Sequence, residues 1–170
     1  MSSSPELFNG PPAIDQTGNH TIWAVQDIAD INAPTLAEIA LGDRITYSFG
    51  VGGYALGVSQ AKNSDPRHTG IVDGESLGKI TPTFSDLTYV DSDDIDSAAF
   101  ILNGGGIWHF VDRRNVSQLE EATADDLVRV IEVDLGPQLP GPTGGDGKFN
   151  LMQAAAIVRL TLEPVAIVAA

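Results

Sequence analysis

Apolar and polar residues alternate along several segments of this chain, and a period of two is typical of a strand with one buried and one solvated face. The clearest alternation runs through 44–49, 131–135 and 158–163. Weaker strand signals, rich in β-branched and aromatic residues, lie at 21–26, 54–59, 84–90, 107–113 and 165–168. Many short amphipathic strands predict a mainly β fold, an antiparallel β-sandwich or barrel.

Two segments carry helical signals instead. Thr35 and Glu38 have the spacing of a capping box directly after a proline, which predicts a short helical turn near 35–41. Further along, apolar residues recur at the i, i+3, i+4 and i+7 positions of one helix face: Ile95, Ala98, Ala99 and Leu102. Acids precede this face and Gly104 follows it, so we expect one flanking α-helix at about 93–103.

The segments between these elements show no period. Residues 1–20 are rich in turn formers and are expected to be an extended N-terminal arm. The remainder, 21–170, has a length that suits a single β domain. Within it we expect two long loops, at 61–82 and 136–147. Loops of this length in a small domain are typical of mobile segments or of segments buried in an assembly.

Charge and composition narrow the classes of function. Asp and Glu outnumber Lys and Arg by 23 to 9, for a formal net charge of −14, and no basic cluster is present to neutralise phosphates. Tight nucleic-acid binding is therefore not expected. The absence of cysteine excludes disulfides and thiolate metal sites. The chain shows neither a secretory leader nor a long apolar run, so we expect no membrane partner.

None of the candidate motifs for metal binding or catalysis has the residue spacing that its chemistry requires. The aspartates between 91 and 96 suggest calcium, but an EF-hand loop begun at Asp91 needs Gly at 96 and Glu at 102, where the chain has Asp96 and Leu102. Acids at the N-terminus of a helix explain the run more simply. The histidines lack the spacing of a metal motif, and no nucleophile elbow is present. The sequence therefore predicts no enzyme, no metal site and no cofactor.

Several short segments follow one another in an order that carries more information than any of them alone. They are Ala33-Pro34-Thr35-Leu36-Ala37-Glu38-Ile39, then Gly42-Asp43 with the strand from Ile45, the acidic helix Asp94 to Leu102, the run Gly104-Gly105-Gly106-Ile107-Trp108-His109-Phe110-Val111-Asp112-Arg113-Arg114, and Val128 to Gly136 before an apolar C-terminal strand. This order resembles the major tail tube proteins of long-tailed, non-contractile phages. It is similar to that family's A-P-T-x-x-E-[IL] and G-[TD] opening and to its glycine turn, apolar strand and arginine pair.

The resemblance implies a structural virion protein. Such a chain would polymerise as stacked hexameric rings into the hollow tail tube through which phage DNA passes during ejection. The implied partners are further copies of the chain, the tail tape measure, the tail terminator and the baseplate or distal tail proteins, with DNA passing unbound. The implied location is the virion tail, after assembly in the host cytoplasm. A continuous lumen wall would also remove the exposed edges of each sheet.

The implied role would also explain the negative net charge of the chain, because an acidic lumen repels the DNA that passes through it. Glu132, Asp134 and Glu163 lie on the polar faces of the clearest strands and are candidate lumen-facing acids; an ordinary solvated strand face is the alternative. Candidate inter-subunit contacts lie in the arm and the two expected loops: Leu7, Phe8, Pro66, Arg67, His68, Pro140 and Pro142.

Two other classes of protein fit an acidic, β-rich chain. One is another virion structural protein, such as a head decoration protein or tail terminator, which copy number per virion would distinguish. The other is a carbohydrate-binding β-sandwich module, which needs exposed aromatic platforms. Trp108 and Tyr47 lie in expected strands, where burial is the default, so this second class is less favoured.

Overall fold

The computed structural model describes residues 15–65, 74–143 and 147–169. The strands are β1 (His20–Val25), β2 (Asp43–Arg44), β3 (Leu56–Asp65), β4 (Gly74–Phe84), β5 (Leu87–Val90), β6 (Gly106–Arg114), β7 (Leu127–Pro140), β8 (Asn150–Leu160) and β9 (Val165–Ala166). The helices are α1 (Leu36–Ala40), the 3₁₀ turn η1 (Thr46–Ser48) and α2 (Ala98–Ile101).

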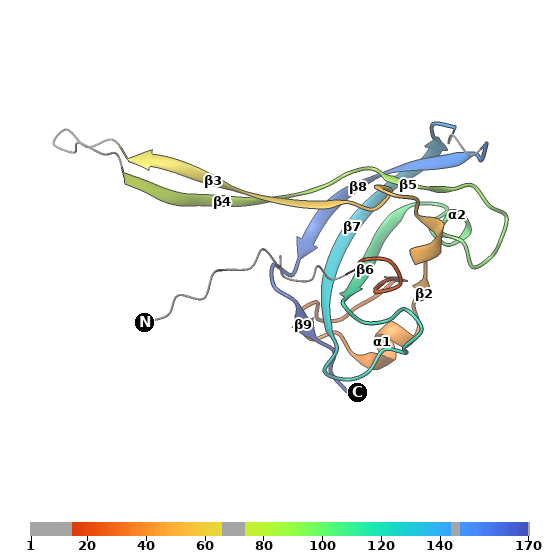
Figure 1. Ribbon diagram of the computed structural model, residues 1–170, viewed down its shortest axis with the longest axis horizontal. Helices are drawn as coiled ribbons and strands as arrows, with labels where there is room; N and C mark the ends of the chain where they lie inside the picture. The colour runs from red at the N-terminus through yellow and green to blue at the C-terminus, as the bar shows by residue number, and fades with distance from the viewer. Residues whose placement is uncertain (1–14, 66–73, 144–146, 170) are drawn as a thin grey trace, which may run out of the picture.

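The body is a curled antiparallel sheet, and a separate hairpin projects from it (Figure 1). The strands of the large sheet follow the order β2-β1-β6-β7-β8-β5, with β9 also paired to β7. The hairpin consists of β3 and β4 alone. The curl gives the body the form of a half-barrel (Figure 1), so the predicted mainly β, antiparallel fold is confirmed.

The sheet is covered on both faces by apolar side chains. One core, with Phe110 and Val133 among its members, lies beneath η1, α2 and the root of the hairpin. The second, with Trp23 and Val111, lies beneath α1 and the segment around β9. β1, β6 and β7 send alternate residues into each core, so β1 is buried along almost its whole length. A strand buried on both faces gives no clean alternation, which explains the weak signal at 21–26.

The helical turn predicted near 35–41 is confirmed as α1. The Thr35 Oγ1 accepts a hydrogen bond from the Glu38 backbone N–H at 3.2 Å, and the Glu38 Oε2 accepts one from the Thr35 N–H at 2.8 Å. The Glu38 Oε1 also accepts a bond from the Ala29 N–H at 2.8 Å. The N–H groups of Ala29 and Thr35 hold the pKa of Glu38 below its ordinary value. The capping box thus also fixes the chain entering the helix.

The strand predicted at 44–49 is wrong beyond its first residues. Only Asp43 and Arg44 pair as β2, and the chain then turns through η1. The Thr46 hydroxyl stops the strand, because it accepts a hydrogen bond at 2.8 Å from the Ile22 N–H on the edge of β1. Ile45 and Phe49 both reach the core, while Tyr47 is exposed. Residues four apart share a side in a strand and in a helical turn alike, so the pattern could not separate the two.

The helix predicted at 93–103 is shorter than expected. α2 begins after the N-cap Ser97, whose Oγ accepts a bond from the Phe100 N–H at 3.2 Å. Ala98, Ala99 and Leu102 are buried as predicted, but Ile95 is exposed. Before Ser97 the backbone is held by side chains instead, since the Asp96 N–H donates to the Asp94 Oδ1 at 3.2 Å. Such local bonds compete with a helical start.

The first segment expected as a long loop is largely strand in its described part, and the second begins as strand. Most of 61–82 belongs to β3 and β4, whose side chains are mainly exposed and therefore show no apolar alternation. Within 136–147, β7 continues to Pro140, which pairs with Leu151 of β8. Pro137 is tolerated because it lies where the register shifts between Leu135 and Gln138. Residues 66–73 and 144–146 lie outside the described part of the chain, as does most of the expected arm, 1–20.

A bulge in β8 changes which of its residues face the core. Glu132 pairs with Arg159, but the next residue, Val133, pairs with Ile157, so Val158 has no partner. Because of this extra residue, Ile157 and Leu160 both pack on the core although they are three apart, and Val158 is exposed. The strand ends at Leu160, and Thr161 beyond it is buried. The predicted alternation across 158–163 is therefore wrong for Val158, Thr161 and Leu162.

Candidate assembly surfaces

The hairpin of β3 and β4 extends well beyond the body (Figure 1). The two strands pair from Leu56 and Phe84 at the root to Asp65 and Gly74, with one register shift near Ala61. Val58 and Leu77 are exposed apolar side chains on it. Among the described residues, no third strand joins this sheet, so its backbone edges are unpaired. Such edges are ready to pair with another chain.

The root of the hairpin is fixed by aromatic packing against the body. Tyr54 meets Phe84 edge to face with ring centroids 5.0 Å apart, and Phe110 of β6 at 6.0 Å. Phe84 stacks on the same Phe110 at 6.3 Å. Across the chain entering and leaving the hairpin, the Ser85 N–H donates to the Ala55 carbonyl at 3.1 Å. The hairpin is therefore anchored at one end and solvated along the rest of its described length.

The large sheet has an open edge on β8. β5 pairs with β8 only from Leu87 opposite Gln153 to Val90 opposite Asn150. In the described part of the chain, no strand pairs with this edge over 154–160. The exposed Val158 lies within this stretch. An open edge with an apolar side chain is a second surface suited to another copy of the chain.

Apolar side chains are exposed at many places on the body as well. Those more than half exposed include Leu41, Tyr47, Val51, Ile95, Phe100, Leu119, Leu127, Leu139, Phe149 and Leu162. They lie on several elements, at both ends of the sheet. Scattered exposed apolar residues need no explanation in a monomer. Beside an unpaired hairpin and an open edge, however, they fit a subunit that has contacts on several sides.

The three predicted lumen acids differ in their surroundings. Glu132 is buried, bonded to the Arg159 guanidinium, and lies 4.0 Å from the His109 Nε2. Asp134, two residues along β7 on the same face, is exposed opposite Ala156. Glu163 is exposed in the segment between β8 and β9. Two of the three carboxylates thus reach solvent, and Arg159 neutralises the third.

Of the predicted inter-subunit contact residues, Pro140 and Pro142 belong to the described part of the chain. Pro140 is exposed at the end of β7, and the Pro142 carbonyl accepts a hydrogen bond from the Asn150 side chain at 3.2 Å. Leu7, Phe8, Pro66, Arg67 and His68 lie outside the described residues. The sequence signal for contacts missed the open β8 edge entirely, because strand pairing is not visible in the pattern of one strand.

The arginine pair at the end of β6 points to opposite faces of the sheet. Arg113 is fully buried over Trp23 and donates to the carbonyls of Ser117, Glu120 and Glu121 and to the Asp126 Oδ2 at 2.8 Å. It therefore holds the β6–β7 connection in place. Burial alone would raise the pKa of Asp126, but the bonds from Arg113 and Thr123 outweigh it and lower that pKa.

Arg114, on the opposite face, is bound to Asp112. Its Nη2 lies 2.7 Å from the Asp112 Oδ2, and the His20 Nε2 lies 2.7 Å from the other carboxylate oxygen. Burial raises the pKa of Asp112, but hydrogen bonds from His20 and Arg114 lower it further than burial raises it. His109 is on the other face, where its Nδ1–H donates to the Gln26 carbonyl at 3.3 Å. His109 and Asp112 are therefore not brought together.

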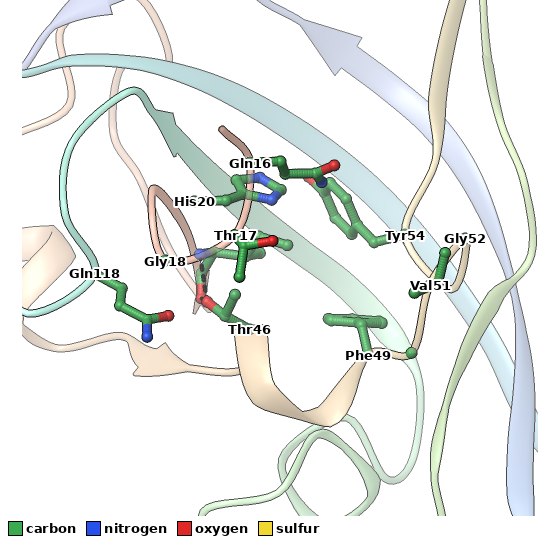
Figure 2. A pocket seen from close by; sticks show the side chains of 12 residues that line it. Gln16, Thr17, Gly18, His20, Thr46, Phe49, Val51, Gly52, Tyr54 and Gln118 are labelled. Carbon is green, nitrogen blue, oxygen red and sulfur yellow. Dashed lines mark hydrogen bonds between the residues drawn. The ribbon is translucent and has the colours of Figure 1, made fainter. Parts of the chain in front are cut away.

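A pocket of about 280 Å³ opens beside His20 (Figure 2). Gln16, His20 and Tyr54 lie along one side of it, with Phe49 and Val51 farther round (Figure 2). The His20 Nε2 lies 2.7 Å from the Asp112 Oδ1, so this ring is tied to β6. Within the described ranges, no group of three or more His, Asp or Glu residues could hold a metal ion, and no helix is long and apolar enough to cross a membrane.

The sequence matches the family described as "Phage tail tube protein" over residues 9–170, nearly the whole chain. The chain belongs to this family. Among curated proteins, none matches it. As a tail tube protein, it is a structural, non-enzymatic component of the virion tail, and its family implies that copies assemble into the tube. In this tail tube protein the hairpin projects from the body (Figure 1), and among the described residues both the hairpin and the β8 edge over 154–160 have unpaired backbone groups.

Proposed function

We propose that this tail tube protein polymerises as hexameric rings that stack into the hollow tail of a long-tailed, non-contractile phage. The observation that carries the proposal is the β3–β4 hairpin, anchored by Tyr54 and Phe84 and unpaired along both edges in its described part. An arm of this kind reaches a neighbouring copy without distorting the body. The open edge of β8 over 154–160 supports lateral closure of the ring.

We further propose that DNA passes through the tube without binding to its wall. The net charge of −14 supports this, since a negative lumen repels the phosphate backbone. Asp134 and Glu163 are the exposed candidates for the lumen wall, and Glu132 would contribute less because Arg159 neutralises it. The tape measure, tail terminator and distal tail or baseplate proteins remain the expected partners at the lumen and the two tube ends.

Negative-stain electron microscopy of the full chain tests the assembly. We expect rings or tubes with sixfold averages at high protein concentration. Leu77→Lys should reduce tube formation because it places a charge on the exposed apolar side of the hairpin. Leu119→Lys is the matched control, since this leucine is also exposed but lies on the β6–β7 connection of the body.

Two outcomes would count against the proposal. Averages with another symmetry, or a persistent monomer at every salt concentration, would contradict the hexameric ring. Equal tube yields from the wild type, Leu77→Lys and Leu119→Lys would show that the hairpin makes no essential contact. For the lumen, Asp134→Lys virions should keep normal tails but release DNA more slowly than Asp134→Asn virions; identical release would remove Asp134 from the wall.

A further inference from the structure

One arginine of the described chain has no carboxylate partner. The other described arginines each bond one: Arg44 with Glu121, Arg113 with Asp126, Arg114 with Asp112 and Arg159 with Glu132. Arg129 donates only from its Nη2 to the Leu162 carbonyl, at 3.3 Å, and its Nε is buried without a partner. In a chain where acids outnumber bases by 23 to 9, an arginine that lacks an internal carboxylate is unexpected. A buried guanidinium nitrogen without a partner is also costly.

Strand pairing places Arg129 beside a second arginine. Arg129 on β7 pairs with Asp112 on β6, and Arg114 lies two residues farther along β6 on the same face. Arg114 uses its Nε and Nη2 for Asp112, so its half-exposed side chain still has donors to offer. Asp112 is thus bonded by His20 and Arg114 and not by Arg129, so the Arg129 guanidinium is left without a carboxylate partner among the described residues.

The two arginines line a groove of about 430 Å³ at the start of β7. Its other walls include the apolar Val116, Leu127 and Pro164. Asp112, Asp125 and Asp126 are also in the lining. Asp126 is held by Arg113 and Thr123, while Asp125 is exposed and forms no ion pair with a described residue. The groove thus offers guanidinium donors within a partly apolar wall, beside acids that disfavour a second negative charge.

We propose that this groove, between Arg114 and Arg129, receives one carboxylate side chain of a neighbouring copy of the chain. The guanidinium fork matches the two oxygens of a carboxylate. A phosphate would bring more charge toward Asp125 and Asp126 than a carboxylate does. Identical neighbours carry an excess of acids, among them the exposed Asp91 and Asp93. The proposal deepens the proposed function and rests on it, because it assumes that copies of the chain meet.

A charge-matched pair of variants tests the contact. Arg129→Gln and Arg44→Gln each remove one positive charge, but Arg44 already has an internal partner in Glu121. We expect Arg129→Gln to raise the protein concentration needed for tube formation by at least about tenfold, as the loss of a charge-assisted hydrogen bond per contact implies. Arg44→Gln should leave that concentration within about twofold of wild type. Both monomers should keep their melting temperatures within a few degrees.

A second measurement needs no variant and works on the monomer. The side-chain Nε–H resonance of Arg129 should shift on titration with sodium acetate, and the same shift should be present in assembled tubes. If Arg129→Gln assembles like Arg44→Gln, or if this resonance is the same in monomer and tube, the proposal is overturned. A shift with inorganic phosphate but none with acetate would equally overturn the carboxylate assignment. The two proposals can fail separately. If the wild type forms no tubes, the proposed hexameric ring is contradicted. If the Arg129 resonance of the monomer does not shift with acetate, the proposed carboxylate site in the groove is contradicted whether or not tubes form.

Discussion

Replacing Gln153 by Leu tests how β8 is joined to β5, to the end of α2 and to β7. Gln153 is fully buried, and its side-chain amide donates to the carbonyls of Leu102 at 3.1 Å and Gly136 at 2.8 Å. Its Oε1 accepts a bond from the Tyr89 hydroxyl at 2.9 Å. One side chain therefore links β5, the end of α2 and the stretch of β7 where the register shifts between Leu135 and Gln138. Leucine has a similar volume but can make none of these bonds.

The expected loss follows from the groups left unpaired. A buried carbonyl, a part-buried carbonyl and one hydroxyl proton lose their partners, at about 1 to 3 kcal/mol each, with the part-buried carbonyl at the low end. The leucine side chain offsets part of this loss, because burying its apolar surface stabilises the fold by roughly 1 to 2 kcal/mol. We therefore expect Gln153→Leu to lower the free energy of unfolding by about 3 kcal/mol. For a chain of this size that corresponds to a melting temperature lower by roughly 6 to 12 °C.

Urea denaturation of the full chain, followed by circular dichroism, measures this loss. Gln26→Leu is the control, because the Gln26 side chain is exposed, and it should change stability by less than about 0.5 kcal/mol. Tyr89→Phe removes one of the three bonds and should cost about 1 kcal/mol. In the double variant the two losses should add to less than their sum. A loss below about 0.5 kcal/mol for Gln153→Leu would refute the reasoning, because the carbonyls would then have found other donors.

Three further results are expected. Gly53→Ala should destabilise the fold by more than about 2 kcal/mol, because its Cβ would lie 2.1 Å from the Thr88 carbonyl oxygen, whereas Gly50→Ala, with nothing within 4 Å, should be close to neutral in the same melts. The charged form of Asp112 stabilises the fold above its ordinary pKa of 3.8, and this contribution is lost as pH falls through the lowered folded value; Asp112→Asn should therefore lose stability at pH 7 and show a flatter decline in acid denaturation. Burial raises the pKa of Tyr89 to about 12, so stability should fall between its ordinary value of 10.0 and about 12, and Tyr89→Phe should remove that step from alkaline melts.

The sequence allowed those parts of the fold to be predicted that depend on local geometry. The Thr35–Glu38 capping box and the buried side of the alternation at Ile131, Val133 and Leu135 need only near neighbours, and both are confirmed, but Glu132 on the side predicted to be solvated is buried. The hairpin was missed because its side chains are mainly exposed, so its pairing leaves no apolar pattern. The β8 bulge was missed because it is a relation between two strands.

The candidate assembly surfaces were predictable to a smaller degree. The polarity of Asp134 was visible in the pattern, but the neutralisation of Glu132 depends on Arg159, 27 residues away. The missing partner of Arg129 is likewise a property of the folded chain, since acids are close to it in sequence yet bond elsewhere. The composition gives the excess of acidic over basic residues, but it does not say which acidic side chain forms an ion pair with which basic one.

The anchored root of the hairpin has a mechanical consequence. β3 has ten residues, so the paired segment extends about 33 Å from the Tyr54–Phe84 contact at roughly 3.3 Å per residue. Over that length, a rotation of about 5° at the root displaces the far end by about 3 Å, close to the rise of one residue. A small change in the packing of the Tyr54, Phe84 and Phe110 rings is therefore magnified at the far end. In a stack of such subunits, these aromatic rings would set the bending stiffness of the tail and the tolerance of each ring for misalignment with the next.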